Sequence, residues 1–224
     1  NYQLLTPEGE QGVIISATPG LNATYIGAGP TEPTFFAHTF ELPAELWAKA
    51  TQAGQHLAIS SIIHPPPVSV PPTIKSRSRI NWYLADRDVA QRYPGSRAIL
   101  LDQAGFVRET STANLFAVRD GRILTAPADT VLPGICRQFT IHFARELGYE
   151  VCEMNMTTDD LLQAQELFTT STPYCLLGVS RLNSASAGLQ FPGPVTEKLI
   201  QAWNELIGVN VHEQLREIAR RRSG

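Results

Sequence analysis

One lysine stands apart from the other basic residues of this 224-residue chain. Only three of the 18 basic residues are lysines, and two of them, Lys49 and Lys198, fall at polar positions of amphipathic helical patterns. Lys75 instead follows the prolines at 65–67 and 71–72, which stiffen the loop that carries it. The amine of a lysine set apart in this way can serve as a nucleophile or as a general base.

A carboxylate, Glu109, ends a predicted apolar strand and is followed by small or hydrogen-bonding residues at 110–114. Two interpretations are open. On spacing alone, a solvent-facing strand end followed by a turn is the simpler one. In the alternative, Glu109 is a buried carboxylate walled by small polar groups. There it would hold a proton on a pyridine nitrogen and keep that ring cationic.

A predicted helix start provides a third feature. Gly134 precedes a helical pattern, so the backbone amides of Ile135 and Cys136 lie unpaired in the first turn. Free first-turn amides and the helix dipole form a natural seat for a phosphate. A plain loop-to-helix start fits the same residues and is the simpler interpretation when they are taken alone. The run at 169–172 adds hydroxyl groups after another predicted strand.

The elements that position these residues are strands and helices in irregular succession. Predicted strands cover residues 12–16, 35–42, 56–63, 98–101, 106–109, 115–118, 122–126, 150–155 and 166–170. Predicted helices cover residues 43–53, 80–89 and 135–147, a segment from 158, and the chain from 194 onward. Asp120-Gly121 is a strong hairpin signal. Hairpins in place of regular βαβ units predict an α+β, barrel-like domain and not a Rossmann sheet.

Composition excludes several classes of function. A formal net charge of −3 gives no electrostatic reason to expect nucleic-acid binding. No apolar run approaches the ~20 residues of a membrane-spanning helix, and the first residues lack the features of a signal peptide. The three cysteines are widely spaced and form neither a disulfide framework nor a metal-binding pair, so no metal site is predicted. We expect a cytoplasmic protein.

Taken together, the chemically interesting residues resemble the signature of the class IV aminotransferases, pyridoxal 5′-phosphate (PLP) enzymes of fold type IV. The signature reads Glu109-x-Ser111-x-x-Asn114-Leu115-Phe116, then Ile123-x-Thr125, then Leu132-x-Gly134-Ile135-x-Arg137. Branched-chain aminotransferases, D-amino-acid aminotransferases and aminodeoxychorismate lyases share it. The resemblance extends over roughly residues 12–205.

The resemblance implies a role for each matching residue. Lys75 would hold PLP as a Schiff base, and Glu109 would lie beside the pyridine nitrogen. The amides of Ile135 and Cys136 would cradle the phosphate, and Thr172 would bond one of its oxygens. The cofactor-binding set implied in this way is Lys75, Glu109, Thr112, Asn114, Leu132, Gly134, Ile135, Cys136, Ser171 and Thr172, with Lys75 as the catalytic residue.

The chain departs from the family pattern at three places. Many relatives have threonine at the position of Cys136, and branched-chain enzymes often have tyrosine at the position of Ile80. The family also has a smaller N-terminal domain, which contributes an arginine and part of the substrate pocket. We expect residues 1–17 to be a remnant of that domain, 18–34 an interdomain linker, and 35–224 the PLP-binding C-terminal domain.

The implied function is transfer of an amino group between an amino acid and a 2-keto acid, in a homodimer with the site at its interface. Aminodeoxychorismate lyase, which releases pyruvate and 4-aminobenzoate with the same cofactor, is the alternative. A PLP-binding module without turnover is a third possibility. The sequence leaves the amino donor, the acceptor and the stereochemistry open.

Overall fold

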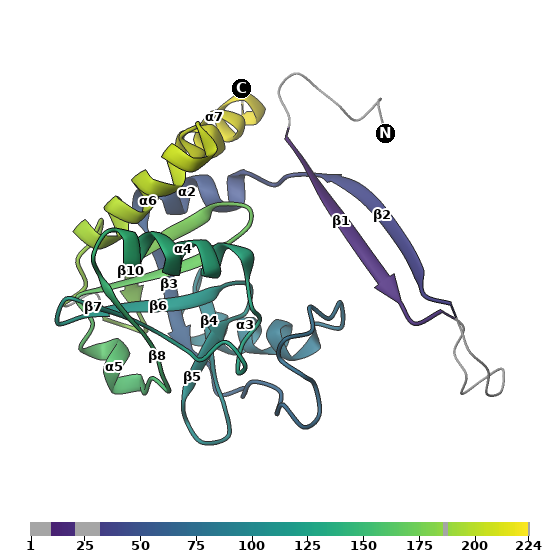
Figure 1. Cartoon of the computed structure of the whole chain (residues 1–224), viewed down its shortest axis with the longest axis horizontal. Coiled ribbons are helices and arrows are strands. Elements are labelled where there is room, and N and C mark those ends of the chain that lie inside the picture. Colours follow the sequence, from purple (N-terminus) through teal and green to yellow (C-terminus); the bar gives the residue numbers. More distant parts are fainter. Residues whose placement is uncertain (1–9, 21–31, 186–187, 224) are drawn as a thin grey trace.

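The computed structural model describes residues 10–20, 32–185 and 188–223 as an α+β protein with one eight-stranded and one two-stranded sheet (Figure 1). The predicted fold class is confirmed. Much of the predicted N-terminal remnant and linker, at residues 1–9 and 21–31, lies outside the described residues, so the domain boundaries stay a prediction. Within the described ranges, no helix is long and apolar enough to cross a membrane.

The large sheet closes on itself to form a barrel. Its strands are β3 (Gln55–Ile59), β4 (Arg97–Leu101), β5 (Val107–Thr110), β6 (Asn114–Arg119), β7 (Arg122–Thr125), β8 (Glu150–Glu153), β9 (Glu166–Ser171) and β10 (Cys175–Leu182), in the order β5-β4-β3-β10-β9-β6-β7-β8. A further pairing of β5 with β6, at Glu109 and Asn114, closes the barrel. Strands β7 and β8 extend the sheet beyond that closure.

The hairpin signal at Asp120-Gly121 is confirmed. Strands β6 and β7 pair antiparallel up to Arg119 and Arg122, which leaves the two predicted residues as the turn. Both turn residues have positive φ, 50° for Asp120 and 75° for Gly121. That is the backbone a two-residue hairpin turn with the twist of the flanking strands requires, and Asp-Gly tolerates it.

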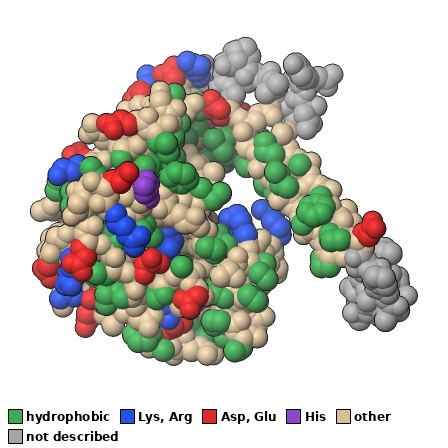
Figure 2. Space-filling model, in the orientation of Figure 1, with side chains coloured by type: hydrophobic (Ala, Val, Ile, Leu, Met, Phe, Trp, Pro, Cys, Tyr) green, Lys and Arg blue, Asp and Glu red, His purple; other side chains and the backbone are tan. Residues whose placement is uncertain are grey.

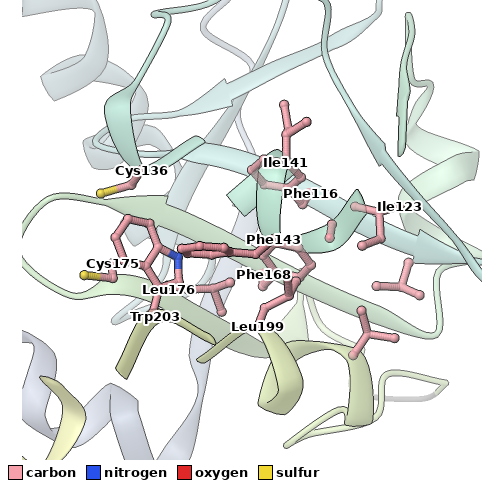
Figure 3. Packing of buried hydrophobic residues seen from close by; sticks show 13 residues of the cluster. Phe116, Ile123, Cys136, Ile141, Phe143, Phe168, Cys175, Leu176, Leu199 and Trp203 are labelled. Atoms are coloured by element: carbon pink, nitrogen blue, oxygen red, sulfur yellow. The ribbon is translucent and has the colours of Figure 1, made fainter. Parts of the chain in front are cut away.

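Six helices occur in the described ranges and cover the barrel. They are α2 (Glu45–Ala53), α3 (Ile80–Arg92), α4 (Ile135–Glu146), α5 (Thr158–Leu162), α6 (Pro194–Ile207) and α7 (Val211–Ser223). Helix α4 packs on β9, and α6 packs on β9 and β10. Phe116 and Phe168 stack with ring centroids 4.9 Å apart, and Trp203 meets Phe143 edge-on at 5.4 Å (Figure 3). This aromatic packing fixes α4, whose first turn forms part of the site.

The structure differs from the predicted elements in two places. The strand predicted over 56–63 ends at Ile59, and irregular backbone continues from there to Arg79. Strand β10 was not predicted. Most of β10 is buried on both faces, so its residues form a continuous apolar run and do not show the alternation that marks a half-buried strand.

Strands β1 (Gln11–Thr18) and β2 (Thr34–Glu41) pair with each other along their whole length and stand away from the barrel (Figures 1 and 2). This two-stranded sheet exposes large apolar side chains, among them Ile15 at 77% and Phe35 at 72%. An isolated hairpin of this kind buries little apolar area within the described part of the chain.

The irregular segment from 60 to 79, which carries Lys75, is anchored to α3 where it leaves β3. The carboxylate of Asp88 accepts hydrogen bonds from the Ser60 hydroxyl at 3.0 Å and from the Ser61 backbone at 2.8 Å. Arg92 donates to Asp88 at 2.8 Å and to the Ile59 carbonyl at 3.0 Å. Burial alone would raise the pKa of Asp88, but these donors outweigh it and lower the pKa to about 2.

We expect Asp88→Asn to destabilise the folded chain at neutral pH. The folded pKa lies below the ordinary value of 3.8, so the ionised form contributes stability above about pH 4 and loses it as the pH falls toward 2. The carboxylate is near solvent, so screening limits the loss to about 1 kcal/mol. Urea unfolding measured from pH 7 to pH 3 should show the difference from wild type shrinking as the pH falls. Asp129→Asn, on an exposed loop residue, is the control for the loss of one negative charge and should leave the free energy of unfolding at neutral pH close to that of wild type.

Candidate active site

All the residues predicted to bind the cofactor line one cavity. They are Lys75, Glu109, Thr112, Asn114, Leu132, Gly134, Ile135, Cys136, Ser171 and Thr172. The cavity is also lined by Thr110, Ser111, Ala113 and Thr170, which belong to the sequence runs noted above but not to the predicted cofactor-binding set, and by Arg79, which sequence analysis did not identify. Separate strand ends, one loop and one helix start therefore converge on the same space. The structure brings these residues together; their roles toward a ligand stay a prediction.

Glu109 is a buried carboxylate. The residue is 8% exposed, so the interpretation as a solvent-facing strand end is wrong. Its Oε2 accepts a hydrogen bond from the Leu132 backbone N–H at 3.2 Å, and its Oε1 lies 3.4 Å from Nε2 of His64. Strand β5 places it at the closure of the barrel, where it pairs with Asn114. Both carboxylate oxygens are thus held in place at the cavity wall.

Lys75 reaches the same cavity from the irregular segment before α3. Partial burial of its amine lowers its pKa below 10.5, and the nearby charge of Arg79 lowers it further, while Glu109 opposes the shift and Arg77 adds to it. A lowered pKa increases the fraction of neutral amine at a given pH. That is the form in which a lysine can act as a nucleophile or accept a proton.

The start of α4 forms another wall of the cavity. Helix α4 begins at Ile135, as predicted, with Gly134 as its N-cap residue. The first backbone N–H groups of a helix have no intrahelical acceptor, so those of Ile135 and Cys136 are available to a ligand. Gly134 is required by close packing, because a Cβ there would overlap Oδ1 of Asn114. Asn114 in turn donates to the Leu132 carbonyl at 2.9 Å.

Hydroxyl groups from two strand ends line the rest of the cavity. The side chains of Ser111 and Thr170 are buried and have no hydrogen-bond partner among the described residues. The Ser171 hydroxyl donates to the Thr112 carbonyl at 3.2 Å, which joins the turn after β5 to the end of β9. A buried hydroxyl without a hydrogen-bond partner lowers the stability of the folded protein. A polar ligand in this cavity could form hydrogen bonds with these hydroxyls, and those bonds would stabilise its binding.

The Cys136 thiol lies in the first turn of α4, beside the end of β9. Hydrogen bonding with the Cys175 thiol lowers the pKa of Cys136, burial opposes this, and the Thr172 hydroxyl adds to the lowering. The two sulfur atoms project to the same side of the cluster in Figure 3. Thr172 and Cys136, which lie 36 positions apart in the sequence, are thereby adjacent in the fold.

Sequence analysis did not identify two residues near the cavity, Arg79 and His64. Arg79 donates to the Ser111 carbonyl and lies over the ring of Trp82, 4.8 Å from its centroid. Its guanidinium is half-buried, and burial lowers its pKa. The short run Lys75–Arg79 was the available signal, since Arg79 immediately precedes the predicted helix that follows the lysine. His64 had no local signal, because its partner Glu109 lies 45 positions later.

The described residues contain no cluster of three or more histidine, cysteine or acidic side chains that could hold a metal ion. The titratable groups that line the cavity are Lys75, Arg79, Glu109 and Cys136. An amine, a guanidinium, one carboxylate and a helix N-terminus form a set suited to an anionic, hydrogen-bonding organic ligand.

The protein-family model for amino-transferase class IV matches residues 8–182, which is most of the chain and includes every predicted site residue.

Among curated proteins, a probable branched-chain-amino-acid aminotransferase of Thermotoga maritima is 33% identical over 163 residues, covering 72% of this chain and 58% of the relative. The branched-chain-amino-acid aminotransferase of Escherichia coli K12 is 30% identical over 184 residues, covering 80% of this chain and 60% of the relative. The chain therefore spans about three fifths of the length of these relatives.

Solved structures agree. A T.th. branched-chain amino acid aminotransferase with pyridoxamine 5′-phosphate superposes with a TM-score of 0.74 at 32% identity, covering 87% of this chain and 64% of that one. The same enzyme in complex with N-(5′-phosphopyridoxyl)-L-glutamate gives 0.72 at 30% identity, with 88% and 64% covered. The fold of this chain matches the corresponding part of these branched-chain amino acid aminotransferase structures.

We expect Gly134→Ala to destabilise the protein by about 1–3 kcal/mol, because the added Cβ displaces the Asn114 side chain and its bond to Leu132. The backbone of Gly134, with φ −63° and ψ 138°, accepts alanine, so the cost arises from the overlap alone. Denaturant unfolding checks it. In Asn114→Ala the overlapping atom is gone, and adding Gly134→Ala there should cost much less. Equal costs in the two backgrounds would contradict this account of the site wall.

Proposed function

The chain belongs to the amino-transferase class IV family, and from that premise we propose that it binds PLP through Lys75 and transfers amino groups between amino acids and 2-keto acids. The observation that carries the proposal is the convergence of the family-type residues, distant in sequence, on one cavity. Because the chain spans about three fifths of the relatives' length, the activity of the whole protein is part of the proposal.

The cavity wall fits the parts of PLP. The Lys75 amine would hold its aldehyde carbon, and the buried Glu109 would bond the protonated pyridine nitrogen. The amides of Ile135 and Cys136, together with the Thr172 hydroxyl, would hold the phosphate at the start of α4. The unpartnered hydroxyls of Ser111 and Thr170 support a polar ligand in this space.

When bound, PLP supplies an electron sink for the charge that remains after a substrate Cα loses its proton. Glu109 would keep the pyridine nitrogen protonated through its ionised carboxylate, held by Leu132 and His64. Lys75 Nζ would accept the Cα proton as a neutral amine and return it to C4′, the former aldehyde carbon of the cofactor. Its lowered pKa favours the neutral form that this proton transfer needs.

The relatives support a substrate class. Curated relatives at 30–33% identity are branched-chain-amino-acid aminotransferases, so branched-chain amino acids are the first donors to test, with 2-keto acids as acceptors. A related structure carries a phosphopyridoxyl adduct of L-glutamate, which supports glutamate as the second amino acid of the exchange. Ile80, where branched-chain enzymes often have tyrosine, is the first residue of α3, 58% exposed, and is not among the residues that line the cavity.

Assembly belongs to the same proposal. A homodimer with its sites near the interface would cover apolar surface that the β1–β2 sheet leaves exposed, including Val13 at 61% and Phe36 at 49%. Such exposed apolar area on a sheet separate from the barrel supports association with further polypeptide.

The experiment that tests cofactor binding is reduction with borohydride. Purified protein mixed with PLP should acquire a stable phosphopyridoxyl label, and peptide mass mapping should place it on Lys75. Lys75→Gln should remove the label while leaving the other two lysines, Lys49 and Lys198, available as internal controls. A label on either of those, or none at all, would contradict the proposal. Steady-state assays of the unreduced protein then separate amino transfer from pyruvate release and from no turnover.

Glu109→Gln should lower turnover while leaving most PLP binding intact. The amide keeps the shape of the side chain but removes the negative charge that stabilises the protonated pyridine nitrogen. Losing one charge-assisted contact costs on the order of 2–4 kcal/mol, which is about 30- to 1000-fold in rate. Steady-state kinetics and PLP titration measure the two effects separately.

Glu166→Gln is the matched control for that variant. Glu166 is also buried but accepts hydrogen bonds from the Val195 and Thr196 amides at the start of α6, away from the cavity. It should lower stability without a specific loss of turnover. A wild-type rate in Glu109→Gln would show that the carboxylate has no part in the chemistry.

A further inference from the structure

His64 occupies a buried position beside Glu109, and the proposed function does not say in which protonation state it holds that carboxylate. It follows the end of β3, is 4% exposed, and its backbone N–H donates to the Leu101 carbonyl at 2.7 Å. Its ring meets Trp82 edge-on, with centroids 5.9 Å apart and planes at 90°. Trp82 in turn lies beneath Arg79, which lines the cavity. These contacts fix the orientation of the imidazole.

Both ring nitrogens of His64 face hydrogen-bond acceptors. Nδ1 lies 3.1 Å from the Pro65 carbonyl oxygen, and Nε2 lies 3.4 Å from Oε1 of Glu109. A neutral imidazole has one N–H donor and one acceptor nitrogen. Neither the Pro65 carbonyl oxygen nor an ionised Glu109 carboxylate can donate a hydrogen bond. A neutral ring has one nitrogen without hydrogen, and the lone pair of that nitrogen would face the lone pair of one of these oxygens. Hydrogen on both nitrogens satisfies both contacts.

The charges around Glu109 are consistent with a donor at this position. Among the described residues that line the cavity, the other charged side chains are Lys75 and Arg79, and Glu109 is the one carboxylate. Its Oε2 accepts from the Leu132 amide, which leaves His64 as the group that faces Oε1. A buried carboxylate held by two donors keeps its charge more readily than one held by a single donor.

We propose that His64 is a positioning residue that donates from Nε2 to Glu109 as an imidazolium, and so holds this carboxylate ionised and aimed into the cavity. The inference rests on the proposed function for its consequence, because the pyridine nitrogen of PLP is the group that Glu109 would meet. The pair His64–Glu109 would then serve the cofactor ring as one unit. His64 does not touch the cofactor itself.

The decisive measurement needs no cofactor. In the nitrogen-15-labelled apoprotein at neutral pH, a long-range proton–nitrogen correlation spectrum reports whether each histidine nitrogen carries hydrogen. We expect both nitrogens of His64 to be protonated, with the signals identified by their loss in His64→Gln. In Glu109→Gln the ring should become neutral, with hydrogen on Nδ1 alone. His142, which pairs with Glu146 on the surface at 3.3 Å, is the internal control and should not respond to Glu109→Gln.

A paired substitution tests the consequence in the holoenzyme. Asparagine places its amide near Nδ1 and keeps the Pro65 contact, whereas glutamine places its amide near Nε2 and keeps the Glu109 contact. His64→Asn should therefore have a kcat/KM at least about 10-fold below that of His64→Gln. The nitrogen-15 shift of labelled PLP should show a less protonated ring nitrogen in His64→Asn only.

The outcomes are separable. A neutral His64 in the wild-type apoprotein, or a ring that ignores Glu109→Gln, overturns the inference whatever the cofactor does. Equal losses of kcat/KM in His64→Asn and His64→Gln overturn the positioning role. Failure of wild-type protein to bind PLP overturns the proposed function but leaves the apoprotein result to decide the state of His64.

Discussion

The pairing of β5 with β6 at Glu109 and Asn114 closes the barrel, and the geometry of the site depends on that closure. The turn between the two strands is held by its own bonds, from the Thr110 amide and hydroxyl to the Ala113 carbonyl, each at 2.9 Å. The Ser111 amide donates across to the Ala98 carbonyl of β4 at 3.0 Å. A short turn tied to both neighbours leaves the carboxylate and the amide at its ends with little freedom. The Glu109 carboxylate faces His64, and the Asn114 side chain faces Gly134 at the start of α4.

The closure of the barrel between β5 and β6 also explains why the residues around the Glu109 carboxylate are small. Asn114 contacts Gly134 so closely that a single methyl group would displace it. Ser111 and Thr170 are buried with unpartnered hydroxyls at the same wall. Larger side chains here would fill the cavity, and apolar ones would leave Glu109 a buried charge without polar surroundings, which is unfavourable. The composition of this wall therefore follows from the need to keep one charge both buried and accessible.

Local sequence patterns predicted much of the fold and of the site. The features that they did not predict depend on contacts between residues far apart in the sequence. The hairpin at Asp120-Gly121 and the helix start at Gly134 have short-range causes, so the sequence shows them directly. The burial of Glu109 has a long-range cause, which is why a strand end facing solvent was the simpler interpretation from spacing. His64 was missed for the same reason. Its proline-rich neighbourhood indicates a loop, and nothing near it in sequence reveals a carboxylate partner.

The site combines groups on the barrel and its helices with Lys75, which lies on a segment without regular secondary structure. Glu109 and the amides of α4 belong to the barrel and to a helix packed on it. Lys75 lies on an irregular segment anchored at its start by Asp88 and at its end by Arg79, with an exposed side chain between. A group that binds covalently and then moves a proton needs to change position, whereas a charge partner and a phosphate seat do not. The division between loop and barrel matches this difference.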